Sequence, residues 1–154
     1  MALGEPSASQ PLLLDQYERL HALLDEISET ASTDCSDTDL LKVAMEHERA
    51  ERRMLTSFAA HIIDIDERSA YRKAGSQTVT NFVTSVLNRS GEANRLLNRV
   101  WAIGKFPPDM QGEVLEPRFP ETAKGVAEGE ISGRNVDVIV EVMKKIPVAV
   151  DPAD

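Results

Sequence analysis

Apolar residues recur at intervals of three and four positions along nearly every apolar segment of this chain. This spacing places side chains on one face of an α-helix, because a helix completes a turn every 3.6 residues. We therefore predict an all-α protein, with a single domain of five or six helices over residues 11–147 and tails at 1–10 (disordered) and 148–154. The clearest stripe consists of Leu13, Tyr17, Leu20, Leu24 and Ile27.

The composition limits the classes of protein to which the chain can belong. Its 154 residues suffice for one domain with a buried core, and aromatic residues make up only 5%, so Leu, Ile, Val and Ala must form that core. The single cysteine, Cys35, cannot form an internal disulfide. With no signal-peptide pattern at the N-terminus, this favours a reducing, cytoplasmic location. No apolar run approaches the roughly 20 residues that span a bilayer, so no membrane association is expected.

Helix-capping and helix-breaking residues divide the chain into segments. Within the second segment, Glu48 and Arg52 have the i,i+4 spacing of a helical ion pair. A turn is expected at Gly75, and a proline-containing connector is expected to run from Phe106 to Pro117. The first expected helix begins near Pro11, and the second runs from a cap at Thr38 or Asp39 to about Arg68. The third covers about 78–88, and the fourth runs from a cap at Ser90 to Gly104. The last two run from Pro120 to Gly129 and from a cap at Ser132 to Ile146.

The last segment admits two interpretations. Four valines alternate between Val136 and Val142, which is the pattern of a strand. Asp137 and Glu141 are four residues apart, however, and Pro147 follows directly after the segment, so we predict a helix.

Charge is distributed unevenly along the chain. Residues 71–105 contain six Lys or Arg against one Asp or Glu, whereas the whole chain has a net charge of −9. Clustered cations attract phosphate groups irrespective of sequence, so this segment is a candidate surface for DNA.

The fourth expected helix divides into two sides on a helical wheel. Its apolar side is predicted to face the core, and its polar side to face outward, with Arg95 and Arg99 beside Asn94 and Asn98. Arg and Asn are the side chains that pair with guanine and adenine edges. The unit at 76–104 is either a helix-turn-helix or an ordinary helical hairpin with a solvated basic face. The candidate nucleic-acid-binding residues are Arg95, Arg99, Asn94, Asn98, Arg89, Arg72 and Lys73.

No motif indicates catalysis. The sequence contains no phosphate-binding loop, no dinucleotide fingerprint and no nucleophile elbow. His21, His47 and His61 lack the partner spacings of metal sites, and no Cys-x-x-Cys is present. We therefore expect no metal, no cofactor and no small-molecule substrate.

Five short segments resemble the 13E12 repeat family in their order and spacing: 75–87, 90–97, 116–123, 129–132 and 136–139. The resemblance extends over residues 51–147. It implies a helical domain of unknown function that usually precedes an HNH endonuclease domain, in proteins often encoded at mobile-element-like loci. The sequence has no HNH ligand set, so the resemblance implies a non-catalytic, DNA-associated module and not an enzyme.

A protein–protein interaction module is the alternative, and the acidic total charge favours it, because dedicated DNA binders usually carry a basic surface. The eight residues from Val136 to Met143 include only two polar side chains. Six helices leave few elements to cover both sides of this segment. We therefore expect self-association, or docking to a C-terminal part that the resembled proteins have, and the stripe of the first helix offers a second surface for pairing.

Overall fold

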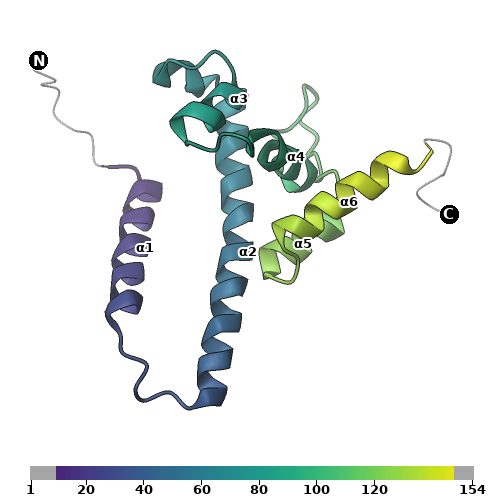
Figure 1. Cartoon of the computed structure of the whole chain (residues 1–154). Helices are drawn as coiled ribbons and strands as arrows, with labels where there is room; N and C mark the ends of the chain where they lie inside the picture. Colours follow the sequence, from purple (N-terminus) through teal and green to yellow (C-terminus); the bar gives the residue numbers. More distant parts are fainter. Residues whose placement is uncertain (1–9, 148–154) are drawn as a thin grey trace, which may run out of the picture. The chain divides into compact units, whose positions relative to one another are not determined.

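The computed structural model describes residues 10–147, and all regular structure in this range is helical. The all-α prediction is therefore confirmed. The predicted tails lie outside the described residues, except for Gln10. The elements in Figure 1 are α1 (Leu12–Glu29), α2 (Asp37–Glu67), the 3-10 helix η1 (Ala70–Ala74), α3 (Val79–Asn81), the π-helical turn η2 (Phe82–Val86), α4 (Ala93–Ile103), α5 (Pro120–Glu128) and α6 (Gly133–Lys145).

The chain divides into two compact units, one ending at Lys42 and the other beginning at Val43. In the first unit, α1 follows Pro11 as predicted and buries none of its residues. The cap predicted for α2 was wrong, because the helix begins at Asp37 and not after Thr38 or Asp39. The hydroxyl of Ser36 accepts a 3.1 Å hydrogen bond from the amide of Asp39, so a residue before the predicted caps fulfils this role.

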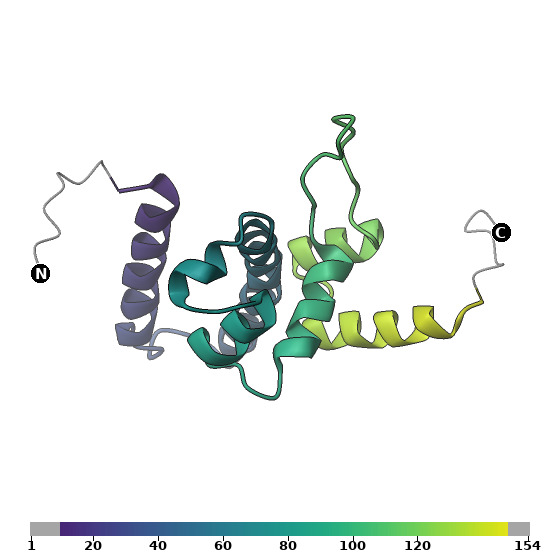
Figure 2. The same cartoon turned by 90° about the horizontal axis from the view of Figure 1, so that it is seen from above.

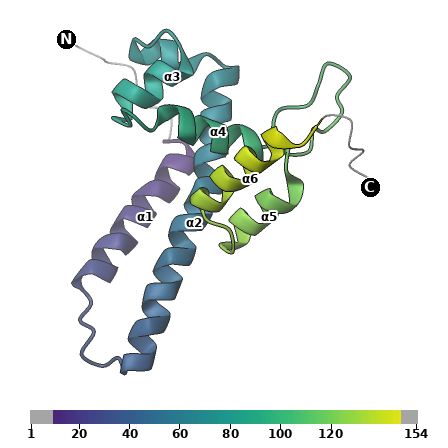
Figure 3. The same cartoon turned by 45° about the vertical axis from the view of Figure 1, so that its right-hand side comes forward.

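The core of the second unit lies between the C-terminal half of α2 and helices α4 to α6. In Figures 1 and 3 these three helices lie together beside α2, and α3 lies near its C-terminal end. The core side chains are almost entirely aliphatic, as the low aromatic content predicted. They comprise Ala59, Ile62 and Ile63 of α2, Val79, Val83, six residues of α4, Val126 of α5, and Val136 and Val140 of α6.

The segment with alternating valines is helical, which confirms the interpretation made from its charges and its proline. Val136 and Val140, four residues apart, are buried, whereas Val138 and Val142 are 56% and 52% exposed. Ser132 caps the helix as predicted: its hydroxyl accepts from the amide of Asn135 at 3.2 Å. The amide side chain of Asn135 in turn accepts from the backbone N–H of Ser132 at 3.1 Å, which completes a capping box.

The central hairpin differs from its prediction in two ways. The expected helix over 78–88 is an α-helical turn followed by the wider turn η2, with Thr78 accepting from the amide of Asn81 at 3.1 Å. The predicted cap at Ser90 was also wrong, because α4 begins at Ala93 after Glu92. Asn88 and Gly91 both have positive φ, so Ser90 lies within a turn and not at the start of the helix.

The proline-containing connector between α4 and α5 has no regular structure, as predicted, and Figure 2 shows it as a long loop. Its far end returns to α4, where the amide of Phe119 donates to the carbonyl of Ala102 at 3.1 Å. The rings of Trp101 and Phe106 stack at the near end, with centroids 5.9 Å apart. The connector thus covers the C-terminal end of α4, where Ala102 is buried.

Gly129 provides a test of the contact between α5 and α2. It ends α5 as predicted, with φ of +81°, and an added Cβ would overlap Arg49 Cγ and lie 3.0 Å from the Arg49 carbonyl oxygen. We expect Gly129→Ala to lower the free energy of unfolding by about 2 kcal/mol, from backbone strain plus the clash. Gly75→Ala is the matched control, because Gly75 has φ of +80° with nothing within 4 Å. Chemical denaturation that gives equal losses for both variants would contradict this contact.

Candidate nucleic-acid interface

The outward face of α4 carries three of the predicted residues. Asn94, Arg95 and Asn98 are all exposed, on the side of the helix away from its buried leucines. Arg95 makes no ion pair with any residue in the range 10–147. This face therefore presents one cation beside two amide side chains, and all three can donate hydrogen bonds to phosphates or base edges.

The prediction that Arg99 faces outward was wrong. Its Nε and Nη2 atoms donate to the two carboxylate oxygens of Asp137, both at 2.7 Å, and this pair joins α4 to α6. The two side chains are only 19% and 25% exposed. The hydrogen bond to Asp137 raises the pKa of Arg99 above the ordinary arginine value, and burial opposes that shift.

The position of Arg99 depends on Gly133, which has no side chain. A Cβ atom at Gly133 would lie 2.6 Å from Arg99 Nη1 and 2.9 Å from its Cζ. The first residue of α6 therefore leaves the space into which the guanidinium fits. The wheel of α4 indicates only the direction of a side chain, so it cannot reveal that α6 covers this flank.

The remaining predicted cations lie on other elements. Arg89 precedes α4 and pairs with Glu92 at 3.1 Å, with both side chains about half exposed. Arg72 and Lys73 are exposed on η1, and neither makes an ion pair within the part of the chain that the structure describes. Of the five candidate cations, three thus carry no carboxylate partner there: Arg72, Lys73 and Arg95.

A cleft of about 530 Å³ lies beside this hairpin, between α2, α4 and the start of α6. Three arginines line it, of which the sequence analysis had identified only Arg89 and Arg99 as candidates. The third, Arg52, gives no signal in the sequence beyond its predicted pair with Glu48, which is confirmed at 3.8 Å. The lining residues are Glu48, Glu51, Arg52, Met54, Leu55, Phe58, Leu87, Arg89, Leu96, Arg99, Ser132 and Gly133.

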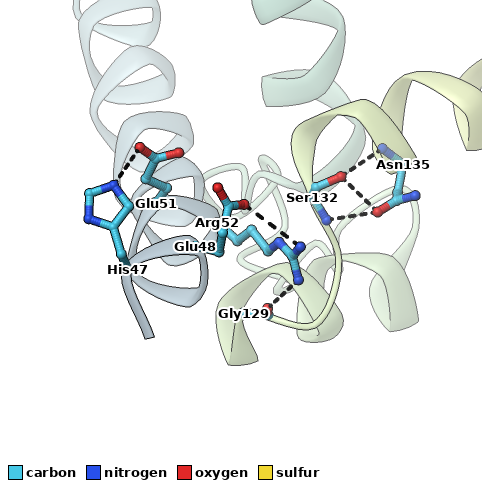
Figure 4. A network of polar contacts seen from close by, with 7 residues as sticks. All are labelled: His47, Glu48, Glu51, Arg52, Gly129, Ser132 and Asn135. Atoms are coloured by element: carbon cyan, nitrogen blue, oxygen red, sulfur yellow. Dashed lines mark hydrogen bonds and ion pairs between the residues drawn. The ribbon is translucent and has the colours of Figure 1, made fainter. Parts of the chain in front are cut away.

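Figure 4 shows polar contacts of α2 and of the segment from Gly129 to Asn135, and four of the residues drawn line this cleft. Besides its pair with Glu48, Arg52 donates to the carbonyl oxygen of Gly129 at 3.4 Å. His47 and Glu51 lie 3.1 Å apart on the same helix, and both are exposed. Each arginine of the cleft thus has a carboxylate partner, which is Glu48 for Arg52, Glu92 for Arg89 and Asp137 for Arg99.

The described residues offer neither a metal site nor a membrane-spanning helix. Among positions 10–147, no group of three or more His, Cys, Asp or Glu side chains is arranged to hold a metal ion. Within the same range, no helix combines the length and the apolar character needed to cross a membrane.

Comparison with known families identifies one domain. The model for the domain of unknown function DUF222 matches residues 41–154, and no catalytic domain is identified. No curated protein and no solved structure matches the chain. The match covers most of the sequence and includes every segment on which the resemblance to the 13E12 repeats was based. The chain therefore belongs to the DUF222 family, whose domain is that of the 13E12 repeat proteins.

Proposed function

We propose that this DUF222 domain is a non-catalytic module that contacts DNA through the outward face of α4. The observation that carries the proposal is the exposure of Arg95 beside Asn94 and Asn98, with no carboxylate pairing with it in the described range. An unpaired guanidinium can bind a phosphate without first breaking an existing ion pair. The resemblance to proteins that carry an HNH endonuclease domain agrees with a DNA partner.

The number of available cations sets the expected strength of this contact. Arg89 and Arg99 are occupied by Glu92 and Asp137, so of the five candidate cations Arg95 on α4, with Arg72 and Lys73 on η1, is left for phosphates. Non-specific binding depends on the number of phosphates neutralised, and falls steeply as salt displaces the protein. We therefore infer weak, sequence-independent binding with a dissociation constant of about 1–100 µM, further weakened by the net charge of −9.

Replacing Arg95 with alanine should weaken DNA binding about five- to tenfold and reduce the salt slope by about one phosphate contact. Fluorescence anisotropy with a labelled duplex at 20 and 150 mM salt measures both quantities. Arg99 is left intact, because removing its half-buried ion pair would change stability as well as charge.

Arg53→Ala is the control for this experiment. Arg53 is an exposed arginine on α2, so the variant loses the same charge without altering the face of α4. Equal effects of the two variants would mean that DNA responds only to total charge. No binding by the parent chain at 20 mM salt would reject the DNA proposal altogether.

A protein-interaction module is the second candidate, and the outer side of α6 supports it. Val138, Val142, Met143 and Ile146 are between 42% and 56% exposed. Exposed apolar residues that cluster on one helix often form an interface. The absence of DNA binding, combined with self-association that is lost on Val138→Asp, would favour this candidate.

A further inference from the structure

The acidic residues and the arginine of α1 all lie on one side of the helix. If Leu13, Leu20 and Ile27 are assigned to heptad positions d, then Tyr17 and Leu24 occupy positions a. Every Asp, Glu and Arg of α1 then occupies position b, c or f, which are the positions farthest from a and d. These charged residues are Asp15, Glu18, Arg19, Asp25, Glu26 and Glu29.

The positions that flank the apolar seam hold no Asp, Glu, Lys or Arg. Positions e hold Leu14, His21 and Ser28, and positions g hold Gln16 and Leu23. In most coiled coils these positions carry charges that select a different partner or a fixed orientation. The leucines here widen the apolar face beyond the a and d seam. Leu14 and Leu23 are 54% and 50% exposed.

We propose that the a and d seam of α1 is a self-association surface, and that its partner is α1 of a second copy of this chain. Of the five seam residues, Leu13, Leu24 and Ile27 are 50%, 48% and 60% exposed, Tyr17 and Leu20 are partly buried, and no residue of α1 is fully buried. A seam with this repeat fits knobs-into-holes packing against another helix with the same repeat. Two identical seams supply this match.

Charge explains why a second copy is the occupant. α1 holds five carboxylates and one arginine, so two such helices would repel each other if the carboxylates lay near their interface. When the two seams meet, all five carboxylates lie toward solvent, because they occupy positions b, c and f. Because the flanking positions hold no Asp, Glu, Lys or Arg, they offer no fixed charge that would favour a partner of opposite charge over an identical helix.

The size of the surface predicts the affinity. The 18 residues of α1 span about 27 Å, which is fewer than three heptads. A pair of helices of this length buries less than the roughly 800 Å² per partner of a standard interface. The dimer therefore forms with a dissociation constant of about 1–50 µM.

The experiment compares two neighbouring positions on opposite sides of α1 in the full chain. Leu24→Glu introduces a carboxylate into the seam, and Ala22→Glu introduces the same group at position f. Sedimentation equilibrium between 1 and 200 µM should show a dimer for the parent chain and for Ala22→Glu. Leu24→Glu should weaken that dimer by at least about thirtyfold, because each of its two carboxylates would be buried without a partner.

Four outcomes would overturn the proposal. The first two are a monomeric parent chain at 200 µM and a dimer that tolerates Leu24→Glu. The third is an equal loss of dimer affinity in Leu24→Glu and Ala22→Glu. The fourth is a loss of dimer affinity in Leu24→Glu that the uncharged variant Leu24→Gln does not share in part. Far-UV circular dichroism of each variant verifies that α1 stays helical, which is expected because Leu24 is half exposed. The result does not depend on the DNA proposal, since Arg95 lies on α4 and is unchanged in all of these variants.

Discussion

Replacing Ile63 with alanine is expected to lower the free energy of unfolding by about 3–4 kcal/mol. Ile63 is 2% exposed, and its Cδ1 atom packs where a side chain on Gly104 would otherwise lie. The residue thus fills the space between α2 and the end of α4. The loss combines the transfer free energy of the deleted methyl and methylene groups with the cavity that they leave, which two helix backbones cannot close without moving.

Ile146→Ala removes the same atoms from a position that is 42% exposed after the end of α6, and serves as the control. Its loss should stay within about 1 kcal/mol. Urea denaturation, followed by circular dichroism at 222 nm, measures both variants. Equal losses would mean that the contact between Ile63 and Gly104 does not anchor the core.

The helices themselves were predictable because they depend on local patterns. The three- and four-residue spacing of apolar side chains located every main helix, and the cap at Ser132 lies directly beside the helix that it starts. The cap at Ser90 failed although it is equally local in sequence. Two residues with positive φ, Asn88 and Gly91, lengthen the preceding turn, and both are of types that adopt this conformation more readily than other residues.

The candidate interface was less predictable because it depends on contacts between distant segments. Arg95 and Arg99 are one helical turn apart and look equivalent on a wheel, yet one is exposed and the other is paired. The difference arises from Asp137, which is 38 residues further along the chain. The spacing of residues within α4 does not indicate where α6 packs against it.

Removing that carboxylate should cost about 2–3 kcal/mol of unfolding free energy, the second large effect expected in this protein. Asp137→Ala leaves the guanidinium of Arg99 without its two 2.7 Å hydrogen bonds in a position that is 19% exposed. Glu141→Ala is the control on the same helix. Its pair with Lys144, at 3.4 Å and with both side chains more than half exposed, is expected to contribute almost nothing.

A double-mutant cycle distinguishes the ion pair from simple packing. Arg99→Ala and Asp137→Ala should each be destabilising, and the double variant should lose about 1–2 kcal/mol less than their sum, because each single change leaves one charge without its partner. Because the pKa of Arg99 is raised by Asp137, the contribution of the Arg99 charge to stability is fully present at pH 7 and up to the ordinary arginine pKa, and it is lost as the pH rises through the raised value. Coupling near zero at pH 7 would mean that α6 is held on α4 by Val136 and Val140 alone, and that Arg99 is free to join Arg95 on DNA.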